Sequence, residues 1–396
     1  MSSDRIDVLV VGGGPAGMAA GISFGRAGLR TLVCERGSLP ADKPCGEGVL
    51  PTGLTYLERL GVSVDLDQEH THPFVGIHYL PTSGTGASAR FAEGPGQGIR
   101  RTELSRAFCE RARRIDGLEV RARTPVTLGA RGPNGAEAWL GGRKVTARLI
   151  VGADGLRSEV RRWAGLQGVS HRRRRFALQQ HFRCEPWSEY VEVHWAGDAE
   201  AYVTPCGRGE VGVALLWEAE KKRNGGGQRL KESLLSRFPR LSESLRGTEP
   251  SANARAIGPM HQVARSPIAD GVALVGDASG YLDAITGEGI SLALAQVQAL
   301  YDSIGPWMLS NDRAPTAREM QGFSRRISRM VRQHQLITGL VLFLSRNPGL
   351  AARAIKGLGR QPELFRWMLS ANMGAASATS IPKLEMMRLA TALVRG

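Results

Sequence analysis

The sequence predicts an α/β fold built around buried parallel strands. The first observation is a short apolar run at residues 6–11, which ends in a glycine-rich turn and leads into a helical stretch. The second is that two further apolar runs, at residues 145–151 and 272–275, also end in glycine-containing turns. Each run has the length of a strand rather than of a helix.

Composition places the chain among globular proteins. It has 396 residues, enough for two to three domains, with 42% apolar and 22% charged residues. The 50 glycines show no G-X-Y period, which excludes a collagen-like chain. The net charge is +15, from 52 basic and 37 acidic residues. This excess suits a phosphate-rich cofactor, an anionic surface or nucleic acid, and composition does not choose among them.

The cysteines and the apolar runs bear on the compartment. Five cysteines occur, and no pair has C-x-x-C spacing, so we expect neither a zinc site, nor any other metal, nor a disulfide framework. The first residues lack the pattern of a signal peptide. The longest apolar stretch, at residues 336–344, is half the length of a membrane span. We therefore expect a cytoplasmic protein, with peripheral membrane contact left open.

The turn after the first strand has the spacing G-x-G-x-x-G. Gly12, Gly14 and Gly17 are its glycines, and Pro15 and Ala16 precede the last of them. The first glycine permits a tight turn, the second lets a pyrophosphate approach the backbone, and the third lets the helix pack on the strand. The helix N-terminus offers free N–H groups to phosphates. We interpret this unit as a Rossmann-type dinucleotide site rather than a turn without a ligand.

A carboxylate follows the second predicted strand, at residues 30–34. Glu35 lies 21 residues after Gly14, at a position where a carboxylate accepts hydrogen bonds from ribose hydroxyls. We include the adjacent Arg36 in the predicted site. A 2′-phosphate would be repelled by Glu35, which disfavours NADP here. This turn alone does not distinguish FAD from NAD.

Two later motifs make that distinction. The first is GADGLRS at residues 152–158. The second has two parts, GDASG at residues 276–280 and GEGI at residues 287–290, where a helix is predicted to start. With the first turn, they resemble, in order and spacing, the three fingerprints of the flavoprotein superfamily of aromatic-ring monooxygenases and geranylgeranyl reductases. The resemblance covers roughly residues 5–335. It implies an FAD-binding domain of the Rossmann type.

The resemblance assigns the flavin end of the site. Asp277 would bind the ribityl chain. The turn at Gly287 would bring the backbone N–H groups of Gly289 and Ile290 to the isoalloxazine. There the N-terminus of a helix stabilises negative charge on the reduced flavin.

Further positions complete the implied FAD site. Arg101 would open a helix toward the phosphate and the ribityl chain, although Arg100 is an equal candidate and a surface role is the alternative. Asp154 and Gly155 would lie where FAD meets a nicotinamide donor, unless Asp154 only caps the next helix. The backbone of Val126 would lie by the adenine. Because no second glycine-rich unit is visible, NAD(P)H would bind transiently, or a protein would donate electrons.

The loop at residues 43–48, KPCGEG, points to one branch of the superfamily. It resembles the K-P-C-G segment of geranylgeranyl reductases, whose cysteine lies by the flavin. The resemblance thus adds Cys45, Gly46 and Gly48 to the site. Cys45 is a candidate catalytic residue, and a small packing residue is the alternative. In contrast, the segment 201–205 keeps the proline of that branch's Y-x-W-x-F-P strand but neither its Trp nor its Phe, and the halogenase pattern W-x-W-x-I-P is absent.

These features favour a FAD-dependent monooxygenase that uses reduced flavin and O2 on a hydrophobic small molecule. The alternative is a geranylgeranyl-reductase-like enzyme that reduces isoprenoid C=C bonds. A further alternative is a flavoprotein that modifies a partner protein. No nucleic-acid recognition motif is present, so we expect no nucleic-acid partner.

The middle of the chain predicts an antiparallel sheet, with strands at residues 175–184, 189–195, 200–205 and 210–217. His181 and His194 are candidate acid–base groups, and we take His181 as catalytic. The simpler interpretation is that both are exposed. Alternation groups Gln179 with His181, and Gln180 with Phe182, without deciding which pair faces the flavin.

The domain limits follow from these elements. The arginine run 172–175 is either a phosphate or membrane contact or, by default, a solvated loop. From residue 316 the chain is predicted to be helical, with Pro348, Pro362 and Pro382 at helix starts; Phe343, Leu344, Trp367 and Met368 are candidates to roof a substrate cavity. We expect an FAD-binding domain (1–72, 99–170 and 265–335), an inserted substrate domain (73–98 and 171–264) and a helical C-terminal region (336–396).

Overall fold

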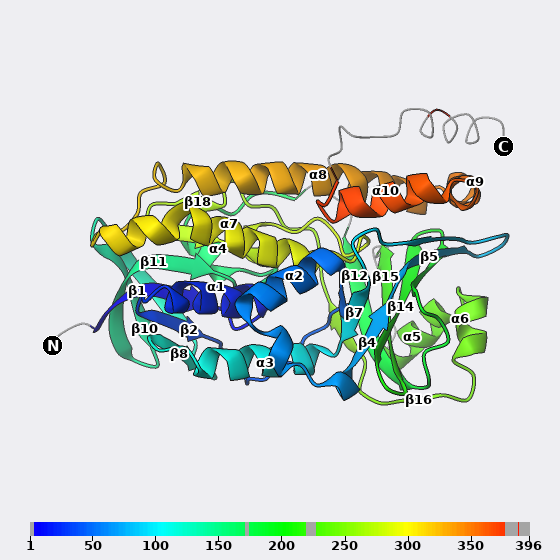
Figure 1. The fold of residues 1–396 in the computed structure, drawn as a ribbon, viewed down its shortest axis with the longest axis horizontal. Coiled ribbons are helices and arrows are strands. Elements are labelled where there is room, and N and C mark those ends of the chain that lie inside the picture. The colour runs from blue at the N-terminus through cyan, green and yellow to red at the C-terminus, as the bar shows by residue number, and fades with distance from the viewer. Residues whose placement is uncertain (1–3, 171–173, 219–226, 377–386, 388–396) are drawn as a thin grey trace.

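Two large β-sheets stand side by side, and helices cover them (Figure 1). The computed structural model describes residues 4–170, 174–218 and 227–376, and residue 387. One sheet is mainly parallel and the other is mainly antiparallel. The predicted α/β fold class is therefore confirmed.

The first sheet contains the three apolar runs on which the fold prediction depends. β1 pairs in parallel with β2 and with β11, and β11 pairs in parallel with β19. The turns that follow β1, β11 and β19 therefore meet at one edge of the sheet. In spatial order the strands are β18 (Ile268–Ala269), β19 (Val272–Leu274), β11 (Arg143–Gly152), β1 (Asp4–Val11), β2 (Thr31–Cys34) and β8 (Leu118–Arg121), and the antiparallel β9 (Val126–Gly132) and β10 (Gly135–Leu140) extend from β11.

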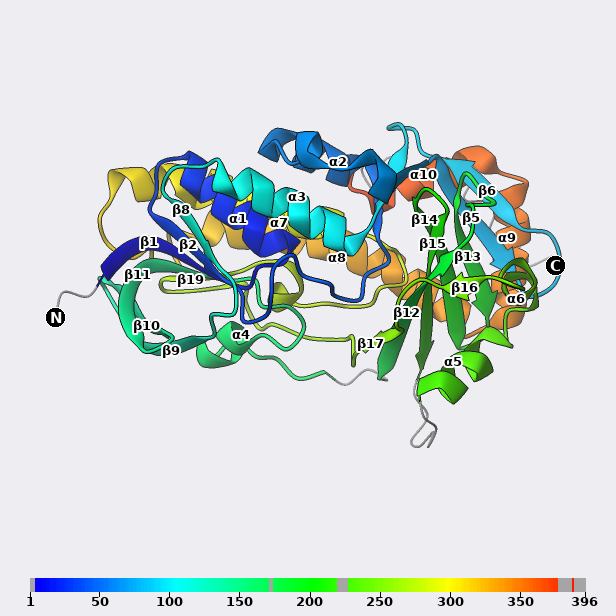
Figure 2. The ribbon, with the colours of Figure 1, turned by 90° about the horizontal axis from the view of Figure 1, so that it is seen from below.

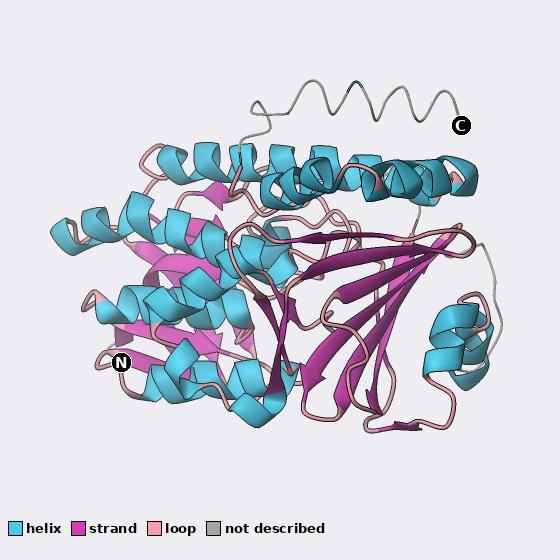
Figure 3. Ribbon diagram, turned by 45° about the vertical axis from the view of Figure 1, so that its right-hand side comes forward, coloured by secondary structure: helices cyan, strands magenta, loops and turns pink. Residues whose placement is uncertain are grey.

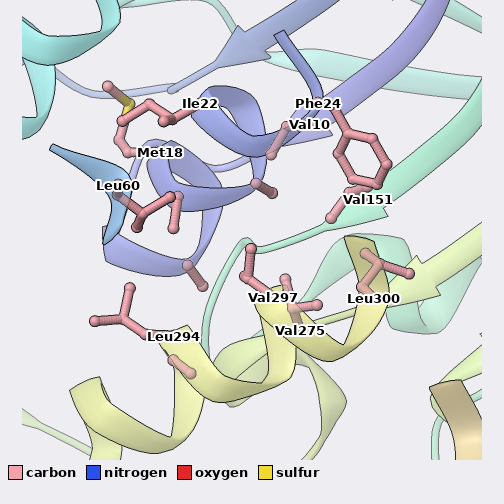
Figure 4. Packing of buried hydrophobic residues seen from close by; sticks show 14 of the residues in the cluster. Val10, Met18, Ile22, Phe24, Leu60, Val151, Val275, Leu294, Val297 and Leu300 are labelled. Carbon is pink, nitrogen blue, oxygen red and sulfur yellow. The ribbon is translucent and has the colours of Figure 1, made fainter. Parts of the chain in front are cut away.

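Helices α1 (Pro15–Arg26), α3 (Arg101–Arg113) and α7 (Gly289–Ser310) cover one face of this sheet. Figure 4 shows buried side chains of α1 and α7 gathered with Val10, Val151 and Val275 of the strands. Small residues bring α1 close to the sheet: a Cβ at Gly21 would lie 2.5 Å from Val33 Cγ2. The short α4 (Glu159–Trp163) packs on the opposite face through Val160.

The second sheet, whose strands fan out in Figure 3, contains the four strands predicted for the middle of the chain, together with strands from earlier and later segments. Its pairs are antiparallel except for β13 and β5, which run parallel. In spatial order the strands are β16 (Glu249–Pro250), β12 (Arg175–Arg183), β15 (Glu210–Glu218), β14 (Ala199–Gly207), β13 (Val191–Ala196), β5 (Gly76–Pro81) and β6 (Ala87–Arg90), with β17 (Arg255–Ile257) also beside β12.

Helices cover both faces of the second sheet. The helices α5 (Gly227–Leu235) and α6 (Pro239–Ser244) lie on one face, and α9 (Pro348–Gly359) and α10 (Pro362–Asn372) lie on the other (Figures 1 and 2). The long α8 (Gln321–Ser345) runs along both sheets, so the expected limit at residues 335 and 336 falls inside one helix. Pro348 and Pro362 begin helices as predicted, whereas Pro382 is outside the described residues. Within the described residues, no helix has the length and apolarity to cross a bilayer.

A small third sheet connects the two large ones. Its strands, β3, β7 and β4, pair antiparallel, and β7 passes so close to β14 that a Cβ at Gly98 would lie 1.6 Å from the carbonyl oxygen of Pro205. The remaining elements are β3 (Gly48–Val49), α2 (Pro51–Leu60), η1 (Ser63–Asp65), η2 (Gln68–His70), β4 (Thr71–Phe74), β7 (Gly96–Ile99) and η3 (Gly276–Ser279).

The arginine run differs from the default expectation of a solvated loop. Arg175 is the first residue of β12 and is buried, with its guanidinium paired to Glu200 at 2.5 Å and to Asp283 at 2.9 Å. Arg174 is exposed, and residues 172–173 are outside the described residues. Two acidic partners from β14 and from the segment after η3 make burial of this charge tolerable.

Candidate functional site

The three glycine-rich turns converge at the carboxyl edge of the first sheet. Gly12 has a φ of +111°, and a Cβ there would lie 2.3 Å from the carbonyl oxygen of Ala153 in the second turn. A Cβ at Gly276, in the third turn, would lie 3.1 Å from the Cβ of Ala16. The first turn therefore touches both of the others, and only small residues permit this approach.

The N-terminus of α1 has the features of an anion-binding site. Gly14 is the N-cap and offers no side-chain cap, and Pro15 is the first helical residue. A Cβ at Gly17 would lie 1.8 Å from the carbonyl oxygen of Gly12, so this glycine is needed for the fold itself. A Cβ at Gly14 would meet only Arg101 Nη2, at 3.7 Å. Arg101 is buried, and its Nε has no hydrogen-bond partner among the described residues, as expected for a guanidinium that awaits phosphate.

Glu35 lies at the end of β2, where the sequence places it, and is buried. Its carboxylate accepts hydrogen bonds from the N–H groups of Gly13, at 2.8 Å, and Gly37, at 3.0 Å, and pairs with Lys43 at 2.9 Å. Burial alone would raise the pKa of this carboxyl, but these donors outweigh it and lower the pKa. Glu35 is therefore ionised and also fixes the first turn, whereas Arg36 is exposed.

Asp277 lies in η3, beside two buried arginines. Burial raises the pKa of its carboxyl to about 6, and the positive charges of Arg101 and Arg161 only partly offset this. Arg161, from α4, is fully buried and donates to the carbonyl oxygen of Ala278 at 2.9 Å. The second motif therefore holds the third through a residue that the sequence analysis did not single out.

Asp154 performs the structural role that was its alternative. Its Oδ2 accepts hydrogen bonds from the N–H groups of Glu159, at 2.6 Å, and Val160, at 3.1 Å, at the start of α4. Its Oδ1 is buried and has no hydrogen-bond partner among the described residues. Gly155 takes the left-handed conformation that a turn requires, with φ +78°, and Val126 begins β9. A contact of these residues with the cofactor stays a prediction.

Cys45 lies between the third turn and the second sheet. Its Sγ accepts a hydrogen bond from the N–H of Glu47, and its own N–H donates to Gln179 Oε1, both at 3.3 Å. Burial raises the pKa of the Cys45 thiol, and the charge of Arg101 only partly offsets this. The thiol is therefore protonated at neutral pH. Among the other loop residues, Gly46 is exposed and Gly48 begins β3.

Glu47 joins this loop to α3 and to the second sheet, and sequence reasoning did not assign it a role. Its Oε1 accepts from the N–H of Arg101 at 2.7 Å, while its Oε2 lies 2.5 Å from His181 Nε2 and 3.2 Å from Cys206 Sγ. Burial would raise the pKa of the Glu47 carboxyl, but His181 and Arg100 outweigh it and keep the pKa low. Glu47 has a left-handed φ of +59°, and its carboxylate lies between α3 and the second sheet.

The interpretation of both histidines as exposed residues is wrong. His181 is buried against Glu47, and His194 is buried against Glu192, with 3.0 Å between His194 Nε2 and Glu192 Oε2. Gln179 and His181 form the pair that faces the loop at residues 43–48, because Gln179 Oε1 accepts from Cys45 and His181 contacts Glu47. His181 Nε2 is thus engaged by the carboxylate of Glu47, and a catalytic role for His181 stays a prediction.

Glu47, His181 and Cys206 are residue types that bind metals, and their ligand atoms lie within 4.8 Å of one another. Here His181 and Cys206 both bond to one oxygen of Glu47, and the 2.5 Å contact is a hydrogen-bond distance. We therefore describe this cluster as a hydrogen-bonded network, and the absence of a metal stays a prediction.

The segment between η3 and α7 is anchored to the second sheet. Tyr202 of β14 donates a hydrogen bond to the carbonyl oxygen of Ile285, and Asp283 pairs with Arg175. After this segment, Gly287 turns with φ +70°, and α7 begins at Gly289. The N-terminus of α7 has no side-chain cap, so the N–H groups of its first residues, including Ile290, are free to face a ligand.

The sheet face beside this segment is apolar and aromatic. Tyr79 of β5 packs on Trp195 of β13, with 5.5 Å between ring centroids, and on Phe365 of α10, with 4.9 Å. Tyr202 belongs to the same buried cluster. Of the four predicted roof residues, Leu344, Trp367 and Met368 pack against this cluster, whereas Phe343 is 55% exposed and points away.

These turns, the uncapped helix ends and the unpartnered Nε of Arg101 define a protein that binds a dinucleotide across one sheet edge. A family profile described as the FAD binding domain matches residues 5–308, and the chain belongs to this family. The protein is an FAD-dependent oxidoreductase. The residues at the three turns fit FAD, and Arg101 Nε and the N-terminus of α1 would donate to its phosphates.

Relatives agree with this assignment. The chain is 30% identical to a menaquinone reductase from Mycolicibacterium smegmatis over 316 residues, 73% of this chain and 74% of the relative. It is 26% identical to digeranylgeranylglycerophospholipid reductase 2 from Methanopyrus kandleri over 307 residues, 73% of this chain and 74% of the relative. A flavoprotein/dehydrogenase from Cytophaga hutchinsonii has the same fold, with a TM-score of 0.83 and 18% identity over 99% of this chain and 98% of that one.

Proposed function

We propose that this enzyme saturates a C=C bond in the polyprenyl chain of a lipid or quinone. The proposal reverses the preference for a monooxygenase, which depended on the missing Trp and Phe of one strand. The relatives named as menaquinone and digeranylgeranylglycerophospholipid reductases support it, since they match about three quarters of the chain at 26–30% identity. NAD(P)H or a protein donor would reduce the flavin.

The observation that carries the proposal is the protonated thiol of Cys45. Saturation of one C=C bond adds a hydride to one carbon and a proton to the other. Reduced FAD supplies the hydride when it is bound. Cys45 would supply the proton from its Sγ–H bond, and the resulting thiolate, stabilised by Arg101, would regain a proton from water.

The aromatic face of the second sheet supports a polyprenyl substrate. The strand β14 has only Tyr202 of the expected aromatic residues, but Trp195 of β13 and Tyr79 of β5 supply aromatic rings from the neighbouring strands. An apolar chain gains about 25 cal/mol for each Å² that it buries, and aromatic surfaces provide much of this. The sequence pattern of one strand therefore underestimates the aromatic surface.

The exposed ridge of α8 gives such a substrate a route from a membrane. Arg325, Arg329 and Arg332 lie on one stripe of the helix with three apolar residues that follow them, Leu336, Leu340 and Phe343, which are 73%, 50% and 55% exposed. A basic stretch beside exposed apolar side chains is typical of contact with an anionic bilayer surface. The ridge would therefore hold the enzyme at the membrane in which polyprenyl lipids reside.

Anaerobic incubation tests the proposed reaction. The holoenzyme would be reduced chemically without O2 and mixed with a menaquinone or with a geranylgeranyl lipid. We expect the product to gain two hydrogen atoms for each saturated bond, and Cys45→Ala to slow this gain while FAD stays bound. A product that forms only after O2 is admitted, and that contains a new oxygen atom, would instead support the monooxygenase.

A further inference from the structure

Glu288 and His334 form a buried pair directly behind the predicted flavin end of the site. Glu288 is the N-cap residue of α7, and His334 lies in the middle of α8. Glu288 Oε2 is 2.9 Å from His334 Nδ1, and both residues are at most 9% exposed. The adjacent Gly287 and Gly289 are exposed. The pair is thus one residue removed from backbone that is open to a ligand.

We propose that Glu288 and His334 form a proton-exchanging pair that sets the charge at the N-terminus of α7, and thereby the reduction potential of bound FAD. The proposal depends on FAD as the cofactor and not on which substrate is reduced. A carboxylate at this position opposes the positive end of the helix dipole, whereas a protonated carboxyl leaves that end available to the reduced flavin.

One carboxylate oxygen of the pair makes no hydrogen bond among the described residues, and this favours a proton on the carboxyl group. Glu288 Oε1 is buried and has no hydrogen-bond partner among the described residues. An unpartnered buried carboxylate oxygen is costly, and a proton on the carboxyl group reduces that cost. The other ring nitrogen of His334 lies 3.4 Å from Thr338 Oγ1, which in turn lies 3.5 Å from Thr286 Oγ1. This chain of polar groups leads back to the half-buried segment before α7.

The charge of the pair changes near neutral pH. Burial raises the pKa of Glu288 to about 7, and His334 only partly offsets this effect. Two tyrosines lie close to this end of α7, and the ionised form of Tyr79 is disfavoured by the charge of Glu288. Burial raises the pKa of Tyr79, on β5, to about 12, and raises that of Tyr281, whose ring lies beside Gly289, well above its ordinary value. Both tyrosines are neutral in this range, so the change of charge arises at the Glu288 carboxyl.

The charge of Glu288 affects the midpoint potential of the bound flavin differently above and below pH about 7. Above pH about 7 the pair loses a proton and becomes more negative, which disfavours the negative charge of the reduced flavin. The midpoint potential should therefore fall more steeply with pH above this point than the flavin's own proton uptake requires. Below it, the protonated Glu288 carboxyl leaves the α7 dipole unopposed.

Redox titration of the holoenzyme without substrate, from about pH 5.5 to 8.5, tests the proposal. We expect Glu288→Gln to remove the steeper part of the profile and to give a higher potential than wild type above pH 7. We expect His334→Gln to move the break to higher pH, because the Glu288 carboxyl loses the imidazole that favours its ionised form. The control is Glu192→Gln, which disrupts another buried Glu–His pair, on β13, and should leave the profile unchanged.

Two results would overturn the proposal. One is a wild-type profile with no change of slope across this range. The other is a Glu288→Gln profile that overlies the wild type while the variant holds stoichiometric FAD. If Glu288→Gln fails to fold, the direction in which His334→Gln moves the break decides the matter. Because no substrate is present, these outcomes are independent of the reaction proposed above.

Discussion

Glu47 and His181 join the loop at residues 43–48 to the second sheet through a contact of 2.5 Å between Oε2 and Nε2. The same carboxylate accepts the N–H of Arg101, whose side chain faces Gly14 in the first turn. One residue therefore sets the distance between the dinucleotide-binding sheet and the sheet beside the predicted substrate. Both partners are buried, so little solvent screens their interaction.

Glu47→Ala should weaken the connection between the two large sheets and also the binding of FAD. The substitution leaves His181 and the N–H of Arg101 without this acceptor, whereas Cys206 keeps the carbonyl oxygen of Thr204, and each unsatisfied buried group costs about 1–3 kcal/mol. Urea unfolding of the apoprotein should show a loss of this order, together with weaker FAD binding. Glu243→Ala removes an exposed pair with Arg246 and is the control, with an expected change below about 0.5 kcal/mol. Equal stabilities of the two variants would refute the role of Glu47.

Two glycines of the first turn should respond differently to the same substitution. A Cβ at Gly17 would lie 1.8 Å from the carbonyl oxygen of Gly12, so Gly17→Ala should destabilise the fold. A Cβ at Gly14 meets no atom closer than 3.7 Å, so Gly14→Ala should fold normally but should exclude the pyrophosphate. Circular dichroism and flavin absorbance separate the two effects. A yellow, stoichiometric Gly14→Ala protein would contradict the phosphate site.

Asp277→Ala should release FAD, because the predicted bond to the ribityl chain is lost. The apoprotein offers a second readout. The pKa of Asp277 is raised in the folded state to about 6, so the native protein binds this proton more tightly than the unfolded chain. Its contribution to stability is complete below pH about 4 and is lost as the pH rises to about 6. Asp277→Asn should remove up to about 3 kcal/mol of this dependence.

The matched control for Asp277 is Asp302→Asn, on an exposed part of α7, where the carboxylate pairs with Arg326. This variant should keep both the flavin and the pH dependence of unfolding. An Asp277→Asn profile identical to that of wild type would mean that the carboxyl is not desolvated as described.

The α8 ridge should determine attachment to membranes. Leu336→Ser with Phe343→Ser replaces two exposed side chains of the ridge, so the fold should be unaffected. We expect the double variant to lose most of its co-flotation with vesicles that contain anionic lipid, and added salt to weaken wild-type binding because the arginine contribution is screened. Leu309→Ser, which alters a 55% exposed leucine of α7, is the control. Unchanged flotation of the double variant would exclude this surface as the membrane contact. If the wild-type protein does not float but a variant without residues 377–396 does, the ridge is not available to membranes in the full chain, which would also contradict the prediction.

Local patterns predicted the parts of this protein that depend on the backbone. The first turn was predictable because its glycines are required by close approaches, such as Gly17 to Gly12, that any such strand–turn–helix unit contains. The strands of the second sheet were predictable from alternation, although β5 joins β13 in parallel from a segment more than 100 residues earlier, which no local signal reveals.

The contacts across the fold could not be predicted in this way. Glu47 stands beside Cys45 in a recognised loop, but its partners come from β12 and β14, so its role depends on how the sheets pack. Arg161 lies three residues after the second motif and no role was predicted for it, although it is fully buried. His334 belongs to a helix with no site motif. For Arg175 the local charge run was misleading, because two distant carboxylates neutralise it.

The most direct test of the account is a single turnover without oxygen. Holoenzyme that has been reduced and freed of excess reductant is mixed with a polyprenyl quinone, and flavin absorbance is followed together with the mass of the lipid. We predict that the yellow oxidised flavin returns in step with the addition of two hydrogen atoms to the lipid, and that Cys45→Ala slows both together. Flavin that stays reduced until oxygen enters, with an unchanged lipid before that moment, would contradict the account.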